Sequence, residues 1–180
     1  MVFSIPLVRF VRLVGAMFST TNPLRSLCLA LALIGGIARA EEALFTATPL
    51  THGDFTLGIE GPACDRQGNI YCVSYREARN IARVTPDGRA ELFVTLPEGS
   101  TGNGIRFNRQ GIMFVADYTG HNVLRIDPKT RVISVHAHHD RMNQPNDLAI
   151  TRDGTLYASD PNWKSGTGQL WRIDRDGRTH

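Results

Sequence analysis

Cross-linking residues and long apolar runs are scarce in this chain of 180 residues. It contains only three cysteines, which excludes a small fold held together mainly by disulfides. Its longest apolar run, Leu27–Ile37, has 11 residues, whereas a helix needs about 20 to cross a bilayer. With 42% hydrophobic and 21% charged residues, the chain can nevertheless bury a core, so a disordered tail is excluded as well.

Acidic residues are absent from the first 40 positions, although four arginines lie there. The apolar run follows the third arginine, and Ala38-Arg39-Ala40 then places small residues where a signal peptidase cuts. We therefore predict that residues 1–40 are a signal peptide removed before Glu41. The protein is then periplasmic or secreted, with no membrane contact after cleavage; a permanent anchor is the alternative. The four arginines are Arg9, Arg12, Arg25 and Arg39.

The formal charge of +3 depends on this leader. Without the four arginines, 16 basic and 17 acidic residues remain, so the mature chain carries about one negative charge. A basic surface that binds nucleic acid through its phosphates is therefore not expected. Translation from Met17 instead of Met1 would shorten the leader and leave the mature chain unchanged.

Cleavage removes Cys28 and leaves Cys64 and Cys72, which an oxidising compartment could join. The pattern around them predicts adjacent strands of one hairpin, with the two cysteines in offset positions. A disulfide needs a narrow range of Cα distances. We therefore favour two unpaired, small, buried side chains, with the disulfide as the alternative.

A repeat of 43 residues organises the mature chain. Three segments align without a gap, and each ends in a glycine: 60–68, 103–111 and 146–154. After each comes a β-rich run, at 70–74, 113–117 and 156–160. A third run follows at 80–84, 122–126 and 169–173, and the first two copies add a fourth at 90–95 and 131–136.

Each unit therefore reads as four short strands separated by turns. Four antiparallel strands in a repeat of this length are typical of a β-propeller blade. We predict an all-β propeller with blades at about 57–100, 101–143 and 144–180, the last without its outer strand. A β-sandwich is the alternative, but it does not require the same residues to recur in register.

Propellers close with about 4–8 blades, whereas this chain holds about three. The sequence thus predicts part of a larger ring. Its partner would be the missing propeller half, or a further copy of itself, because an open arc leaves sheet faces uncovered.

Polar residues recur at the start of the first strand of each blade, where strands line a propeller's channel. They are Glu60, Asn103 and Asn146. A carboxylate and two amides suit a hard cation such as Ca²⁺, which binds six to eight oxygen atoms. The alternative is that the two asparagines cap their own backbone.

These motifs resemble those of the gluconolactonase, regucalcin and luciferin-regenerating enzyme family. The resemblance rests on Glu60-Gly-Pro62, Asn103-Gly-Ile105 and Gln144-Pro-Asn-Asp147, followed by Asp153–Tyr157 and Ser159-Asp-Pro161. It implies a six-bladed propeller with a divalent metal, usually calcium, in the channel, and hydrolysis of a small sugar lactone.

Carried over by motif, the resemblance makes Glu60 and Asn146 metal ligands and gives Asn103 and Asp147 substrate-binding roles. The Asp that serves as base belongs to later blades, so no catalytic residue is assigned here. Trp163 lies in the longest loop within a blade and is a candidate wall of the substrate pocket, with packing as the alternative.

Other polar residues have simpler expected roles. Asp117 and Asp160 end second strands and should bond a turn backbone. Arg83, Arg125 and Arg172 recur on third strands and should form exposed or cross-blade ion pairs. A histidine group follows an outer strand and should be solvated rather than bind a metal. It comprises His136, His138, His139 and Asp140.

Two other functions stay open: a non-catalytic exported propeller resembling NHL-repeat proteins, and an inert gene fragment. Glu60 with Asn146-Asp147 favours the enzyme, since a simple binding repeat does not need these residues. As a partial ring, the chain is expected to bind calcium weakly, to show no appreciable lactonase activity and to associate. We further expect 43–48 to form a strand that joins a later blade.

Overall fold

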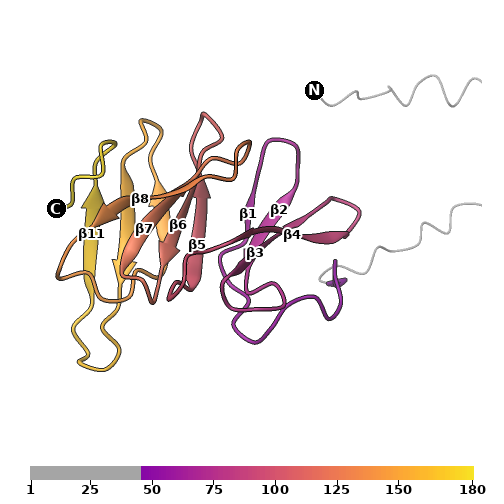
Figure 1. Ribbon diagram of the computed structural model, residues 1–180, viewed down its shortest axis with the longest axis horizontal. Coiled ribbons are helices and arrows are strands. Elements are labelled where there is room, and N and C mark those ends of the chain that lie inside the picture. Colours follow the sequence, from indigo (N-terminus) through magenta and orange to yellow (C-terminus); the bar gives the residue numbers. More distant parts are fainter. Residues whose placement is uncertain (1–45) are drawn as a thin grey trace, which may run out of the picture. The chain divides into compact units, whose positions relative to one another are not determined.

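A computed structural model describes residues 46–180, and Thr48–His180 form one compact unit (Figure 1). This part of the chain consists of strands and turns, without a helix, and so contains no helix that could span a membrane. The predicted signal peptide and its cleavage site lie outside the described residues, as does most of the strand expected at 43–48. Residues 46–48 are not in a strand.

The strands form three successive antiparallel sheets, each built from neighbours in the sequence. The first holds β1 (Ala63–Cys64), β2 (Ile70–Val73), β3 (Asn80–Val84) and β4 (Ala90–Thr95), in that order. The second repeats this order with β5 (Gly102–Phe107), β6 (Met113–Asp117), β7 (Asn122–Ile126) and β8 (Ile133–His138). The third consists of β9 (Leu148–Ile150), β10 (Leu156–Asp160) and β11 (Gln169–Ile173).

This arrangement confirms the predicted all-β propeller blades, and the sandwich alternative is wrong. The innermost strand of the second sheet, β5, contacts β1 and β9, so the inner strands of successive sheets lie side by side. The third sheet has no fourth strand, although Thr179 forms a single antiparallel bridge to Ile173.

The first hairpin of each blade depends on a side chain that bonds its own turn. Asp65 Oδ1 accepts hydrogen bonds of 2.9 Å from the backbone N–H groups of Gln67 and Asn69. Asn108, one repeat later, accepts them from Gln110 and Ile112 at 3.0 and 2.9 Å. This local bonding reverses the chain without help from another blade.

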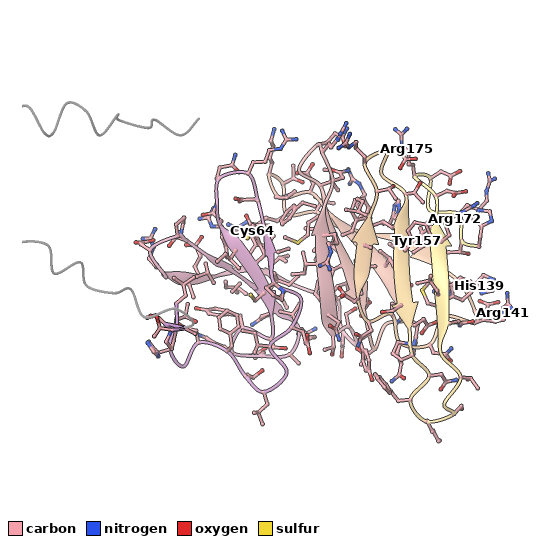
Figure 2. All side chains as sticks on the ribbon, turned by 180° about the vertical axis from the view of Figure 1, so that it is seen from behind. Cys64, His139, Arg141, Tyr157, Arg172 and Arg175 are labelled. Carbon is pink, nitrogen blue, oxygen red and sulfur yellow. The ribbon has the colours of Figure 1, made fainter. Side chains whose placement is uncertain are left out.

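The core lies between sheets, because the middle sheet buries both faces. On β6, Met113 and Val115 pack toward the first sheet, while Phe114 and Ala116 pack toward the third. Alternation along a strand sends successive side chains to opposite faces. On the third sheet, Tyr157 and Arg172 stand opposite each other on β10 and β11, and Arg172 is exposed (Figure 2).

The two described cysteines are unpaired. Cys64 lies opposite Ile70, two residues from Cys72 on the neighbouring strand, which confirms the predicted offset. Cys72 is buried and Cys64 is exposed, so the expectation of burial holds only for Cys72.

β8 begins later than predicted and extends to His138, which corrects the expectation for the histidine group. His136 belongs to the strand, and its ring packs edge-on against Phe114 with centroids 4.8 Å apart. His136 is therefore half-buried rather than solvated, whereas His138 is exposed.

Candidate functional site

The structure brings the three predicted channel positions to neighbouring places. Gly61 lies so close to Asn103 that a Cβ atom on it would come within 1.9 Å of the Asn103 carbonyl oxygen. Gly104 approaches the next blade just as closely, because a Cβ there would lie 2.6 Å from Asp147 Oδ1. We call the resulting row the site edge: Glu60, Gly61, Asn103, Gly104, Asn146 and Asp147.

Backbone geometry fixes this edge. The pairing of β5 with β6 shifts by one residue between Gly102 and Ile105, so Asn103 and Gly104 form a β-bulge, a feature that redirects side chains. The backbone N–H of Gly104 donates to the Asn146 carbonyl at 2.7 Å. Glu60 is held on its own blade, where its carbonyl accepts a 3.2 Å bond from Val73.

Three of the four polar side chains of this edge have no partner among the described residues. Glu60, Asn103 and Asn146 make no side-chain hydrogen bond or ion pair within 46–180. The two asparagines therefore do not cap their own backbone there, contrary to the alternative considered from the sequence. Glu60 is exposed and the asparagines are half-buried, so one carboxylate and two amide groups are free to bind a ligand.

Asp147, unlike the other three polar residues of the site edge, forms side-chain hydrogen bonds. Its Oδ1 accepts hydrogen bonds from the Leu148 backbone at 2.8 Å and from Arg106 Nη2 at 3.1 Å. Its own N–H donates to Ser159 Oγ at 3.0 Å. Asp147 thus joins the second and third blades through Arg106, and 62% of its side chain remains exposed.

The sequence reasoning missed Arg106. The repeat carries no signal for it, because Ala63 and Ala149 occupy the equivalent positions of the other two blades. Only the fold shows that this guanidinium reaches the next blade at the site edge.

Trp163 lies in the loop that joins β10 to β11, at the same end of the third blade as Asn146, whose N–H donates to the Ser159 carbonyl. Trp163 is 69% exposed, so it does not pack into the core of residues 46–180. Its backbone N–H donates to Gln144 Oε1 at 3.2 Å, and Gln144 Nε2 donates to the Tyr118 hydroxyl at 2.7 Å. Tyr118 and Gln144 therefore support this loop.

Two buried carboxylates stabilise the connections that lead to this edge, which confirms the role expected for Asp117 and Asp160. Asp117 accepts hydrogen bonds from the backbone of Thr101 and Gly120 and from the Ser100 hydroxyl. Asp160 accepts from the backbone of Asn143 and Gln144. Burial raises the pKa of Asp160, but these bonds outweigh it and hold that pKa below its ordinary value.

The three arginines of the third strands differ from one another. Arg83 pairs with Glu91 across β3 and β4, at 2.5 Å, and Arg172 lies 3.4 Å from Asp174. Arg125 has no ion pair within residues 46–180, so the expectation is wrong for this residue.

Nothing in the described part of the chain gathers three or more His, Cys, Asp or Glu side chains into a metal site. The histidine group does not converge, since His138 approaches Asp140 at 3.7 Å while His136 packs on Phe114. Glu60, Asn103 and Asn146, by contrast, occupy neighbouring positions along the site edge.

Comparison with known proteins decides the family. The profile of the SMP-30/gluconolactonase/LRE-like region matches residues 57–180. The chain belongs to this family. A gluconolactonase of Zymomonas mobilis is 30% identical over 116 residues, and the match covers 57% of this chain and 33% of the relative.

Solved structures share the fold. A gluconolactonase from Xanthomonas campestris superposes with a TM-score of 0.58 at 20% identity, over 71% of this chain and 47% of its own. A calcium-binding regucalcin from Agrobacterium tumefaciens gives 0.56 at 20% identity, over 70% and 43%. This chain thus spans about a third of the curated relative and less than half of either structure.

Proposed function

We propose that this chain supplies part of the site of an exported, calcium-dependent hydrolase of small sugar lactones. Family membership supports the reaction class, and the curated relative is a gluconolactonase. The observation that carries the proposal is the site edge, where Glu60, Asn103 and Asn146 stand in three successive blades with free side chains.

The donor set suits calcium. Hard cations prefer carboxylate and amide oxygens, and Ca²⁺ takes six to eight of them. Glu60 and Asn146 would hold the ion, with Asn103 beside them on the central blade. Bound there, calcium would polarise the lactone carbonyl and stabilise the negative charge that develops on its oxygen.

The chain's own residues would bind and orient the sugar. Asn103 offers an amide that can both donate to and accept from hydroxyl groups. Asp147 keeps its second oxygen, Oδ2, free of bonds to described residues, while Arg106 fixes Oδ1. The exposed ring of Trp163 provides an apolar surface for one face of a sugar.

The other groups of the proposed site, including its general base, would come from further blades of the propeller ring. The resemblance assigns the general base to an Asp of a later blade, and no residue of 46–180 takes that role here. The exposed face of the third sheet, with Leu170 67% exposed, is where we expect a further blade to pack.

Hydrolysis of glucono-1,5-lactone, followed by acid release, tests the proposal. The mature chain and a longer form with further blades after His180 are compared, each with calcium and with a chelator. We expect calcium-dependent hydrolysis in the longer form, lost in Glu60→Gln and kept in Asp87→Asn, whose residue is exposed and lies in the turn that joins β3 to β4, at the other end of the blade. A longer form that binds calcium without hydrolysing any lactone would favour the non-catalytic propeller.

A further inference from the structure

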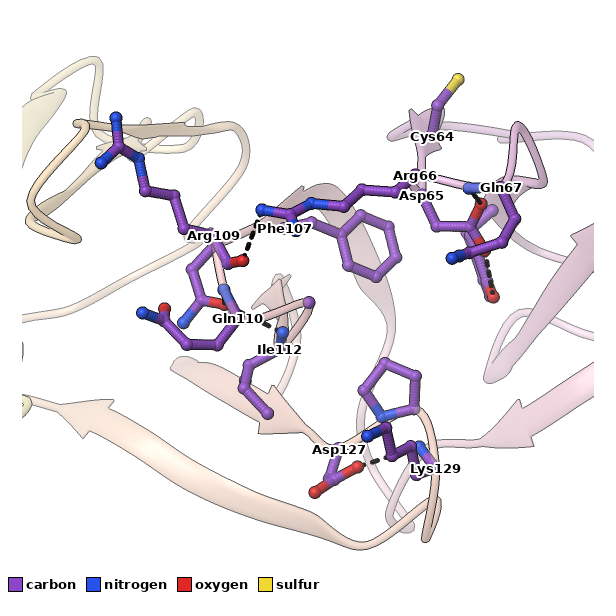
Figure 3. A pocket seen from close by; sticks show the side chains of 14 residues that line it. Cys64, Asp65, Arg66, Gln67, Phe107, Arg109, Gln110, Ile112, Asp127 and Lys129 are labelled. Carbon is purple, nitrogen blue, oxygen red and sulfur yellow. Dashed lines mark hydrogen bonds between the residues drawn. The ribbon is translucent and has the colours of Figure 1, made fainter.

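Two cavities lie beside the β-hairpin turns, at the end of the blades opposite the site edge. One of about 650 Å³ lies between the turns of the first and second blades (Figure 3). The other, of about 480 Å³, lies between the turns of the second and third. Both volumes fall in the range of small-molecule pockets, about 300–1,000 Å³.

The smaller cavity, which we call the arginine cavity, is rich in positive charge. Its lining includes His136 and four arginines, Arg109, Arg125, Arg152 and Arg175. None of the four makes a side-chain hydrogen bond or ion pair with a described residue. Arg175 projects from the turn that follows β11, at the upper end of the third sheet in Figure 2.

Negative charge that could neutralise these arginines is scarce. Asp153 is the one carboxylate in the lining of the arginine cavity, and it accepts hydrogen bonds from the hydroxyl groups of Thr151 and Thr155. Asp176 lies near His136 but pairs with Arg178 at 3.5 Å. Four guanidinium groups therefore share a recess without a matching set of anions, which concentrates a positive potential there.

Comparison of equivalent positions in the first two blades explains why Arg125 has no ion-pair partner. Arg83, its equivalent in the first blade, stands directly opposite Glu91 and bonds it. Arg125 stands opposite Ser134, which is 43 residues after Glu91. The second blade thus keeps the cation of this pair and replaces its carboxylate with a small neutral side chain.

A second difference between the first and second blades lies in the outer strand, next to Arg125. The first and second blades each carry a bulge in their outer strand, which contains Phe93 in β4 and His136 in β8. Phe93 packs on Tyr71 and His136 packs on Phe114, again one repeat apart. The second blade thus has a polar ring where the first has an apolar one, and the buried Nε2 of His136 has no partner. Burial lowers the pKa of that histidine, so its ring is neutral at neutral pH.

The neighbouring cavity provides a contrast. There Arg66 donates to the Arg109 carbonyl at 2.6 Å, and Asp65 and Asp127 accompany Arg66 and Lys129 in the lining (Figure 3). With Arg109, which also lines this cavity, three cations stand beside two carboxylates there. The arginine cavity holds four arginines and one carboxylate, so its excess of positive charge is the larger of the two.

We propose that the arginine cavity binds a small organic anion through a phosphate or sulfate group. Guanidinium groups bind such oxyanions in a bidentate manner, and the His136 ring adds a further hydrogen-bonding nitrogen. The cavity lies at the opposite end of the blades from Asn146, because the turn at 151–154 joins the far ends of β9 and β10. This site is therefore separate from the site edge and does not depend on lactone hydrolysis.

Calorimetric titration of the mature protein at low ionic strength tests the proposal, since exposed charges are screened by salt. The probes are inorganic phosphate, inorganic sulfate, glucose 6-phosphate and glucose. We expect the oxyanions to bind and glucose not to bind, and a preference between phosphate and sulfate identifies the natural group. Arg125→Gln combined with Arg152→Gln should weaken binding at least about tenfold, because two charge-assisted contacts are lost.

Two further variants make the result specific. Arg89→Gln removes an exposed arginine from a turn of the first blade and should leave the affinity unchanged. His136→Phe restores the ring found in the first blade and should weaken binding several-fold while the fold is retained. Equal affinity in the double variant and in Arg89→Gln would overturn the proposal, as would no oxyanion binding up to about 10 mM.

Discussion

The buried carboxylate of Asp160 accepts a hydrogen bond of 2.7 Å from the indole nitrogen of Trp171. Asp160 ends β10 and Trp171 lies on β11, and the same carboxylate accepts hydrogen bonds from the backbone that leads into β9. One side chain thus links three segments of the third blade beneath the site edge. Asp117 bonds the corresponding connection of the second blade.

We predict that Asp160→Asn lowers the free energy of unfolding by about 2–4 kcal/mol, because each buried donor left without an acceptor costs about 1–3 kcal/mol. Urea unfolding measures the change. Asp140→Asn is the matched control, since its side chain is fully exposed, and it should change stability by less than about 0.5 kcal/mol. A similar effect of both variants would contradict this role.

Asp160 should also make the stability of the fold depend on pH in the acidic range. Its pKa is lower in the folded chain than the ordinary value of about 3.9, so its contribution is complete above that value and is lost as the pH falls through the folded pKa. The stability difference between the wild type and Asp160→Asn should therefore shrink below about pH 4. Urea midpoints between neutral and acidic pH measure this, and a difference that stays constant would refute it.

Substitution of Gly104 tests the close contact between the inner strands of the second and third blades. We predict that Gly104→Ala destabilises the chain by about 1–3 kcal/mol, the usual cost of overpacking, because its Cβ would lie 2.8 Å from the Asp147 Cα. Gly168→Ala serves as the control, since its nearest atom would be 3.8 Å away. Thermal unfolding of both variants gives the comparison. If Gly104→Ala proved as stable as the wild type, the inner strands could not lie as close as described.

Cys64 and Cys72 should differ in their reactivity toward an alkylating reagent, and no prior reduction should be needed because both are free thiols. Burial raises the pKa of the Cys72 thiol, and Cys64 nearby adds to the effect, while Cys64 is exposed. We expect iodoacetamide to modify Cys64 quickly in the folded mature protein and Cys72 only after unfolding, because the thiolate is the reactive form. Mass spectrometry of the peptides measures both rates. Recovery of a linked peptide containing both residues would show the disulfide instead.

The sequence predicted the blades well because each strand and turn depends on local chemistry that the repeat copies. The turn at Asp65–Gly68 closes through its own side chain, and the alternation on β6 follows from burial on both faces. The positions of Glu60, Asn103 and Asn146 could be predicted for the same reason. β8 was misplaced because the turn at 127–132 is one residue longer than the corresponding turn at 85–89, so the strand begins later, 43 residues after β4.

Features that differ between repeats could not be found in this way. Arg106 has alanine at its equivalent positions, so no register pointed to its bond with Asp147. The signal for the arginine cavity was in the sequence, as Ser134 in place of Glu91 and His136 in place of Phe93. Its meaning depends on knowing that Arg125, Arg152 and Arg175 line one recess, which only the fold shows.

In the proposed site, Glu60 and Asn146, from blades that are not adjacent, should bind one divalent cation beside Asn103. Calcium titration of the mature protein by calorimetry tests it most directly, with Glu60→Gln and Asn146→Ala as site variants and Asp87→Asn, in the turn that joins β3 to β4, as the control. We predict weak but measurable binding by the wild type, weakened at least about tenfold in both site variants and unchanged in the control, because calcium affinity follows the number and charge of its oxygen ligands. Calcium binding by Glu60→Gln as tight as that of the wild type would contradict a cation site at Glu60.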